Sequence, residues 1–397
     1  MPLPMPENEE TTAPELRVAL FTGNYNYIKD GVALTLNRLV AFLLKRGVPV
    51  LIFAPVGEKP AFESVGELVA LPSIAIPKRK EYRIALGLPA AARQKLETFR
   101  PTLFHIAVPD IAGYKALKLA ERWGVPVVAS YHTRYDTYLR FYGLGLLEKL
   151  GQRYLRYFYN RVRRVYPPSE SMAQIIRDEG QSSNVEVWAR GVDAELFSPV
   201  KRDMAWRRSL GIGGDEIAVS FVGRLVKEKN VAIVVRVLQA LTTQGLRIRP
   251  LIVGNGPEMG AMMSGFPTGV FPGFLHGEDL ARAYASSDIF FFPSESETFG
   301  NVTLEAMASG VPAVNAIASG SNSLVVEAVT GYLVSARDET LLAARIAALA
   351  KDAGLRQRMG AAARQRALQF SWDAILSGLV ASYRDVLREA QAEKNGH

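Results

Sequence analysis

Residues 294–310 of the chain read SESETFGNVTLEAMASG and directly follow the apolar run IFFFP at 289–293. The apolar run predicts a buried strand, the polar stretch a loop, and the residues from about Asn301 onward a helix. Glu297 then lies in a loop at the carboxyl end of a strand, and Glu305 about one turn into the helix. Open α/β sheets bind ligands at this edge, and the N–H groups at a helix start suit an anion. An acidic first helical turn would explain either glutamate alone, but not two that flank a Phe-Gly turn, so the segment predicts a ligand site.

The sequence on both sides of this segment alternates between short apolar runs and helical patterns. This βαβ alternation predicts parallel sheets with helices on their faces, and the two halves of the chain look alike. We therefore predict an α/β protein of two doubly wound, Rossmann-like lobes. The expected strands are 16–22, 48–54, 103–107, 125–130, 184–189, 217–222, 249–253, 289–293 and 311–315. The expected helical stretches are 32–46, 112–123, 138–166 (one or two helices), 230–244, 340–369 and 372–389.

Composition excludes several kinds of chemistry. The 397 residues include no Cys, so disulfides, thiolate nucleophiles and Cys-ligated metals are excluded. The four His show no metal-ligand spacing, so we expect no metal and no cofactor. No apolar run is long enough to span a bilayer, and residues 1–15 are acidic and Pro-rich, which predicts a disordered arm. We expect the protein in the cytoplasm.

Three further places could touch an anionic ligand. Arg224 and Lys229, in GRLVKEK at 223–229, follow an expected strand and could meet at the sheet edge, where Arg offers a fork and Lys a point charge to phosphate oxygens. On its own this stretch also fits a solvated basic loop. Gly31 precedes a helix and allows close approach of backbone N–H groups to a phosphate. His132 follows a strand, where a lone His is usually structural.

These strings together resemble the retaining glycosyltransferases of family 4, which have the GT-B fold. The resemblance covers about residues 16–385 and rests on the two glutamates eight residues apart with the following LEAMASGVPAV, supported by shorter strings in family order. These are SYHT at 130–133, GVDAELF at 191–197, GRLVKEK at 223–229, GNGPE at 254–258 and SWDAI at 371–375. The family often has Gly-Gly-Val at the first loop, where this chain has Asp30-Gly31-Val32.

The resemblance implies two lobes that face a central cleft, with the C-terminal helix returning to the N-terminal lobe. The implied domains are an arm at 1–15, an acceptor-binding domain at 16–195, a nucleotide-sugar-binding domain at 196–370 and the returning helix at 371–397.

The resemblance also implies a role for each candidate residue. Arg224 and Lys229 would hold the diphosphate of a nucleotide-sugar donor, and Gly31 would approach a phosphate. Glu297 would contact the sugar hydroxyls and Glu305 the ribose, while Phe299, Gly300 and Asn301 would offer backbone N–H groups. His132 would lie against the sugar. The implied reaction is retaining and metal-independent, with the acceptor attacking the face that the diphosphate leaves.

The region 134–164 interleaves aromatic and basic residues, which is typical of a surface that rests on anionic lipid. An ordinary amphipathic helix with its aromatics in the core is the alternative, and we favour it for Tyr154, Phe158 and Val162. Nucleic acid is disfavoured because no binding motif is present. The basic residues are Arg134, Arg140, Lys149, Arg153, Arg156, Arg161, Arg163 and Arg164.

The string RYDTYLRFYGLGLLE at 134–148 also resembles bacterial GDP-mannose-dependent mannosyltransferases and, more loosely, sulfolipid synthases. We therefore predict transfer of a hexose from GDP-mannose, a UDP-hexose or a UDP-hexuronate to a membrane lipid or glycolipid, at the inner face of the cell membrane. A soluble sugar or sugar phosphate is the alternative acceptor. A nucleotide-sugar epimerase and a non-enzymatic basic binding protein remain alternatives of other classes.

Overall fold

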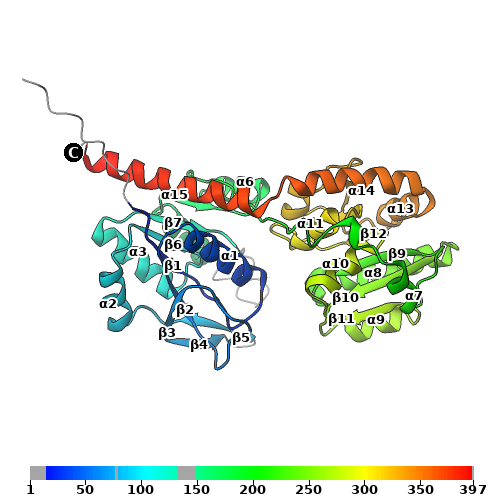
Figure 1. Cartoon of the computed structure of the whole chain (residues 1–397), viewed down its shortest axis with the longest axis horizontal. Helices are drawn as coiled ribbons and strands as arrows, with labels where there is room; N and C mark the ends of the chain where they lie inside the picture. Colours follow the sequence, from blue (N-terminus) through cyan, green and yellow to red (C-terminus); the bar gives the residue numbers. More distant parts are fainter. Residues whose placement is uncertain (1–14, 77–78, 133–147, 396–397) are drawn as a thin grey trace, which may run out of the picture. The chain divides into compact units, whose positions relative to one another are not determined.

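The computed structural model describes residues 15–76, 79–132 and 148–395. The chain divides into two compact units (Figure 1). The first comprises Met1–Tyr166, Ile176–Glu186 and Leu376–His397, and the second comprises Pro167–Ile175 and Val187–Ile375. Each unit has its own parallel sheet, and each is described by itself below. Except for Glu15, the arm expected at 1–15 lies outside the described residues.

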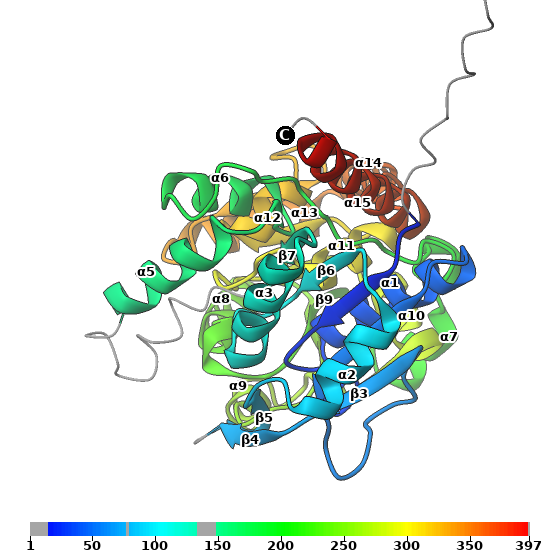
Figure 2. The ribbon, with the colours of Figure 1, turned by 90° about the vertical axis from the view of Figure 1, so that its left-hand side faces the viewer.

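The first unit is built on a six-stranded parallel sheet in the order β3-β2-β1-β6-β7-β8. A separate antiparallel hairpin, β4-β5, precedes α2, and α3 packs against β1 and β6 (Figure 2). The strands are β1 (Val18–Phe21), β2 (Val50–Pro55), β3 (Glu67–Leu71), β4 (Ser73–Ile76), β5 (Arg79–Ala85), β6 (Leu103–Ile106), β7 (Val127–Ser130) and β8 (Arg164–Tyr166), and the helices are α1 (Gly31–Lys45), α2 (Ala90–Phe99), α3 (Ile111–Trp123), α5 (Glu148–Tyr159) and α6 (Glu170–Asp178).

The second unit repeats this plan with the order β11-β10-β9-β12-β13-β14. Its strands are β9 (Ile217–Val222), β10 (Ile248–Val253), β11 (Val270–Gly273), β12 (Ile289–Phe292), β13 (Ala313–Ala316) and β14 (Gly331–Val334), and its helices are α7 (Met204–Ser209), α8 (Val231–Thr243), α9 (Met259–Gly265), α10 (Gly277–Ala285), α11 (Asn301–Ala308), α12 (Ser319–Leu324), α13 (Glu339–Lys351) and α14 (Ala353–Leu368). Two 3₁₀ turns, η2 (Pro199–Lys201) and η3 (Lys227–Lys229), belong to its loops. In each sheet the next two strands in sequence are added on one side of the first strand, β1 or β9, and the later strands are added on its other side. This is the doubly wound pattern.

The cores explain why the central strands read as apolar runs. Helices cover parallel sheets on both faces, so strand residues on both faces are buried. In the first unit the rings of Phe21 and Phe53 stack at 4.8 Å, and those of Phe21 and Phe104 at 5.6 Å. In the second unit Phe221 and Phe292 lie at 5.2 Å across neighbouring strands. The expectation of two doubly wound α/β lobes is confirmed.

The last helix, α15 (Trp372–Asn395), begins in the second unit and continues in the first from Leu376 onward. Three contacts hold it to the first unit. Arg164 Nη2 lies 2.7 Å from Glu389 Oε1, Tyr383 bonds to His105, and Lys394 Nζ donates to Gly124 O at 2.8 Å. The predicted return of the C-terminal helix to the N-terminal lobe is therefore confirmed.

Three expected elements differ in the structure. The one or two helices expected at 138–166 do not reach residue 166: α5 ends at Tyr159, and residues 164–166 form the strand β8. The expected strand 184–189 is reduced to an isolated bridge between Val165 and Val185. The helical stretch 340–369 is two helices, because Asp352 accepts from Leu355 N at 2.8 Å and starts α14. A three-residue strand inside a basic stretch leaves no periodicity to detect.

Candidate functional site

The candidate residues of the second unit gather where the strand order reverses. Strands β9 and β12 are neighbours in the sheet, yet β10 and β11 lie between them in sequence. The connections from the two strands therefore leave in opposite directions, and this switch point is where open α/β sheets bind ligands. Arg224 and Lys229 lie in the loop after β9, and Glu297 lies in the loop after β12.

An ion pair between Lys229 and Glu297 joins these two loops directly. Lys229 Nζ also lies 3.3 Å from Ser296 Oγ, and Asn230 Nδ2 donates to Pro293 O at 2.8 Å. The Lys229 and Glu297 side chains keep 21% and 20% of their exposure. The pair is thus accessible to a ligand, while the bonds around it limit its motion. The two residues are 68 positions apart in sequence, so no local sequence pattern indicates their contact.

The loop that carries Arg224 is held by close backbone packing. Leu225 N donates to Asn255 O at 3.0 Å, and Leu225 O accepts from Glu258 N at 3.0 Å. A Cβ on Gly254 would lie 1.9 Å from Gly223 O, and one on Gly256 would lie 2.2 Å from Leu225 O. Gly254 and Gly256 are therefore required in the GNG string, because a side chain at either position would push the two loops apart. The Arg224 side chain itself is exposed.

The turn at Phe299–Asn301 is fixed by buried neighbours. Phe299 is buried and packs edge-on against Phe370 at 6.0 Å. Gly300 has φ +93° and is the N-cap of α11, so it supplies no capping side chain. Gly320 N donates to Glu297 O at 2.9 Å, and a Cβ on Gly320 would lie 2.4 Å from Phe299 C. These contacts fix the position of the backbone N–H groups at the start of α11, which begins at Asn301.

Glu305 lies just over one turn into α11, where its partner is a buried phenol. Tyr284 on α10 donates from its hydroxyl to Glu305 Oε2 at 3.0 Å. Burial first, and then the negative charge of Glu305, raises the pKa of Tyr284 far above its ordinary value. The phenol therefore stays protonated and remains a donor that orients the carboxylate. Nothing in the sequence pattern singled out Tyr284.

Gly31 and His132 belong to the first unit. Gly31 begins α1, and Asp30 is the N-cap, with Oδ1 accepting from Ala33 N at 2.8 Å. Asn24 Nδ2 donates to Asp30 Oδ2 at 3.0 Å. The Asp30 side chain therefore caps the start of this helix. His132 is buried, 7% exposed, with Nε2 at 2.7 Å from Ser130 Oγ.

The structure thus brings Lys229 and Glu297 into contact. Arg224, Phe299, Gly300 and Asn301 lie on the two loops that flank this ion pair or at the start of α11, and Glu305 lies one turn further along that helix. Gly31 and His132 lie on the other unit. Of the basic region 134–164, residues 134–147, including Arg134 and Arg140, lie outside the described residues.

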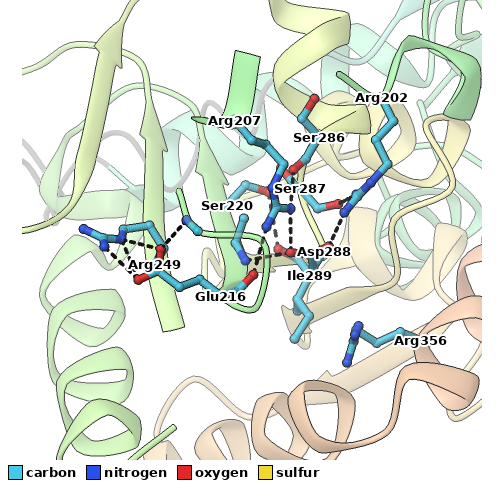
Figure 3. Close-up of polar contacts among 12 residues, drawn as sticks. Arg202, Arg207, Glu216, Ser220, Arg249, Ser286, Ser287, Asp288, Ile289 and Arg356 are labelled. Carbon is cyan, nitrogen blue, oxygen red and sulfur yellow. Dashed lines mark hydrogen bonds and ion pairs between the residues drawn. The ribbon is translucent and has the colours of Figure 1, made fainter. Parts of the chain in front are cut away.

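A second charged cluster lies at the amino ends of the strands of the same sheet, opposite the candidate site (Figure 3). Glu216 and Asp288 immediately precede β9 and β12, so they mark the amino ends of these strands. Arg207, 1% exposed, bonds to Asp288 Oδ2 at 2.8 Å and to Glu216 O at 2.8 Å. Arg202 and Arg249 complete the cluster with Asp288 and Glu216, each at 2.7 Å. Every acid in it is paired, and it joins α7 to the sheet, which is a structural role.

Two observations describe the part of the chain that the structure covers. No group of three or more His, Asp or Glu side chains in residues 15–76, 79–132 and 148–395 is arranged to hold a metal ion. Within the same ranges, none of the helices combines the length and the apolar character that crossing a membrane requires.

Comparison with known proteins gives the family. Residues 29–196 match the model for Glycosyltransferase Family 4, and residues 203–366 match the model for Glycosyl transferases group 1. A GDP-mannose-dependent alpha-mannosyltransferase of Corynebacterium glutamicum is 33% identical over 383 residues, covering 95% of this chain and 90% of that protein. A sulfoquinovosyl transferase of Arabidopsis thaliana is 29% identical over 382 residues, covering 94% of this chain and 74% of that protein.

Among solved structures, sucrose-phosphate synthase from Thermosynechococcus elongatus superimposes with a TM-score of 0.78 at 20% identity, covering 94% of this chain and 100% of that one. This similarity establishes the GT-B fold. A nucleotide-sugar-dependent, retaining hexosyltransferase is thus the class that fold and relatives define. The chain belongs to glycosyltransferase family 4.

Proposed function

We propose that this protein transfers a hexose, with retention, from GDP-mannose or from a UDP-hexose or UDP-hexuronate to a membrane lipid or glycolipid. The observation that carries the proposal is the Lys229–Glu297 pair at the switch point between β9 and β12. The names of the mannosyltransferase and sulfoquinovosyl transferase relatives support the choice of donor and acceptor. We further propose that residues 16–195 bind the acceptor and residues 196–370 the donor, with the helix in 371–397 joining the first of these domains.

The cationic residues of this site are proposed to bind the donor diphosphate. Lys229 approaches an oxygen of the diphosphate as a point charge, and the exposed Arg224 offers two parallel N–H donors. Gly31 adds a backbone contact to a phosphate. The negative charge on the leaving diphosphate grows as the sugar–oxygen bond breaks, so these groups bind it more strongly in the transition state than before it.

The remaining site residues are proposed to bind the sugar and the nucleoside. Glu297 accepts hydrogen bonds from the sugar hydroxyls, and Glu305, oriented by Tyr284, accepts them from the ribose hydroxyls. The N–H groups of Phe299, Gly300 and Asn301 donate to the sugar. His132 contacts the sugar from the first unit. Each of these contacts positions the anomeric carbon relative to the acceptor.

The proposed reaction forms no covalent bond between the sugar and the protein. The bond between the anomeric carbon and the diphosphate oxygen breaks, and both electrons leave with the diphosphate. The acceptor hydroxyl then bonds to the same face of that carbon, and its proton passes to the phosphate oxygen that has just left. Charge stabilisation comes from Arg224, Lys229 and backbone N–H groups, so we expect full activity in EDTA.

The surface formed by α3 and α5 is proposed to contact the anionic membrane. Tyr157 on α5 is exposed and lies between two cations, with Arg161 at 4.4 Å and Lys118 at 5.6 Å from its ring centre. Exposed apolar side chains accompany these cations. Phe158 and Val162 are buried, as the core interpretation expected, and Tyr154 is half-buried. The exposed members of this α3/α5 surface are Ile111, Tyr114, Lys149, Leu150, Arg153, Arg156, Tyr157 and Arg161.

This combination is typical of interfacial binding, since each Lys or Arg near an anionic surface contributes about 1 kcal/mol. It supports a peripheral location on the inner face of the membrane. Flotation with vesicles of phosphatidylcholine and phosphatidylglycerol tests it. We expect binding to vesicles with the anionic lipid, weakened by high salt, and lost in Arg153→Glu/Arg156→Glu. Equal binding to neutral vesicles would contradict the anionic preference, and no binding to either kind of vesicle would favour a soluble acceptor.

Transfer itself is tested with labelled GDP-mannose, UDP-glucose and UDP-glucuronate in the presence of a bacterial lipid extract. The proposal expects label in the lipid phase with the anomeric configuration of the donor. Conversion of the donor to an epimer without any acceptor would contradict it. Epimerisation by proton abstraction would need a positioned acid or base, and the proposed roles of the site residues include none.

A further inference from the structure

A chain of buried hydrogen bonds links His132 to the C-terminal helix. His132 Nε2 lies 2.7 Å from Ser130 Oγ, and Ser130 Oγ lies 2.9 Å from His105 Nε2. The other ring nitrogen of His105, Nδ1, lies 2.7 Å from the hydroxyl of Tyr383 on α15. Four elements or their ends contribute: α15, β6, the last residue of β7 and the segment after it. Every member is at most 7% exposed.

The direction of donation follows from the phenol. Burial raises the pKa of Tyr383 far above its ordinary value, so the hydroxyl keeps its hydrogen. Within the described residues, the acceptor that the structure gives it is His105 Nδ1, and a buried O–H donates rather than remaining unpaired. A neutral imidazole that accepts at Nδ1 carries its proton on Nε2. His105 therefore donates to Ser130 Oγ.

His132 is the next member of this chain of hydrogen bonds. Ser130 Oγ accepts from His105 and uses its own hydrogen for His132 Nε2. A neutral His132 then carries its proton on Nδ1, because the bond made by one ring nitrogen decides which nitrogen is protonated. The rings of His105 and Tyr383 also pack edge-on at 5.8 Å, which restricts their rotation.

We infer that Tyr383, acting through His105 and Ser130, is a positioning residue that fixes the ring orientation and the Nδ1–H tautomer of His132. The inference rests on the proposed function only for its consequence, because His132 is the group proposed to contact the donor sugar. It adds the C-terminal helix to the machinery of the transfer reaction. It also gives a reason for two buried histidines, one on β6 and the other just after the neighbouring strand β7.

Tyr383→Phe is the variant that removes the phenolic hydrogen and keeps the ring. Tyr166→Phe is the matched control: Tyr166 is equally buried, its ring lies 6.5 Å from that of His105, and its hydroxyl bonds to Ser382 on the same helix at 2.8 Å. Both variants lose one buried hydroxyl next to α15. Only the first loses the link to His105.

The direct readout is nitrogen NMR of the full-length protein labelled with ¹⁵N-histidine. The chain has four His, so variants His132→Gln, His276→Gln and His397→Gln assign the signals. In the wild type we expect His105 as the Nε2–H tautomer and His132 as the Nδ1–H tautomer. Tyr383→Phe should convert His132 to a mixture of tautomers, and Tyr166→Phe should leave it unchanged. The Nε2–H tautomer of His132 in the wild type, or no change in Tyr383→Phe, would overturn the inference.

Kinetics separate the inference from the proposed function. Tyr383→Phe should lower kcat about 10-fold, as loss of an outer hydrogen-bond partner commonly does, while the KM for the donor changes less than about threefold. Tyr166→Phe should keep the wild-type kcat. If His132→Gln also retains the wild-type kcat, the proposed role of His132 is wrong, yet the NMR result still decides whether Tyr383 sets its tautomer. A wild-type kcat in Tyr383→Phe with His132→Gln inactive would overturn the positioning role.

Discussion

The Lys229–Glu297 pair gives the most informative perturbation, because its two members are expected to affect binding in opposite directions. Lys229 is paired with Glu297, and a diphosphate must compete for it. Lys229→Ala removes the cation and should weaken binding of a bare nucleoside diphosphate. Glu297→Gln releases the cation and should leave that binding unchanged or make it tighter, although the sugar loses a carboxylate partner.

The size of each effect follows from the exposure of the pair. Both side chains keep about one-fifth of their exposure, so removing either should cost about 1 kcal/mol of folding stability, as for solvent-accessible ion pairs. Loss of one group that stabilises transition-state charge typically costs about 10²–10³ in kcat, or about 2.7–4 kcal/mol. Lys229→Ala should therefore lose far more activity than stability.

The assay combines titration calorimetry with nucleoside diphosphate, steady-state transfer kinetics and urea unfolding. Arg236→Ala is the matched control, since Arg236 pairs with Glu339 at 2.6 Å between α8 and α13 of the same unit. It should change neither kcat nor diphosphate affinity. A kcat for Lys229→Ala within threefold of the wild type would refute the reasoning, as would weaker diphosphate binding in Glu297→Gln than in Lys229→Ala.

Three further predictions concern positions outside that pair. Burial raises the pKa of Asp110 from 3.8 to about 6, so the folded state binds the proton more tightly than the unfolded state and the wild type loses stability as the pH rises from about 4 to 6. Relative to the wild type, Asp110→Asn should gain about 2 kcal/mol of unfolding free energy over this range, since a tenfold ratio of acid constants corresponds to about 1.4 kcal/mol. Urea unfolding measures this difference, and a difference that does not vary with pH would contradict the prediction. Asp288→Ala leaves the buried Arg207 without its carboxylate and should cost about 3 kcal/mol in urea unfolding with donor affinity unchanged, whereas a loss below 1 kcal/mol would show that Ser286 O and Glu216 O suffice. Gly256→Ala places a Cβ 2.2 Å from Leu225 O and should displace the Arg224 loop, raising the donor KM about 10-fold by analogy with misplaced catalytic groups; Gly378→Ala, where nothing lies within 4 Å, should not.

The sequence predicted the architecture because apolar runs and helical periodicity reflect burial on a parallel sheet. The strand at 289–293 and the loop and helix after it were predictable for that reason. The strand at Arg164–Tyr166 was not, because three residues within a basic stretch show no periodicity. The predicted positions of Arg224, Lys229 and Glu297 relied on motif order, but the contact between Lys229 and Glu297 depends on which strands are neighbours.

Partners that act through a single long-range hydrogen bond escaped sequence reasoning. Tyr284 meets Glu305 only because α10 and α11 pack together. Tyr383 meets His105 across 278 residues of sequence. Neither tyrosine differs in its local pattern from one that fills a core. Asp30 was noted as a departure from the family, and its role as a helix cap became visible only with the structure.

The central claim is that the loops after β9 and β12 form the diphosphate site of a nucleotide-sugar donor. Thermal-shift measurements with UDP, GDP, ADP, UDP-glucose, UDP-glucuronate and GDP-mannose test it most directly. A ligand at 100 times its dissociation constant should stabilise the wild type by about 2.7 kcal/mol, with a clear preference for one base, and Arg224→Ala/Lys229→Ala should lose this stabilisation. Equal stabilisation of the wild type and the double variant, or none in either with anionic vesicles present, would contradict the claim.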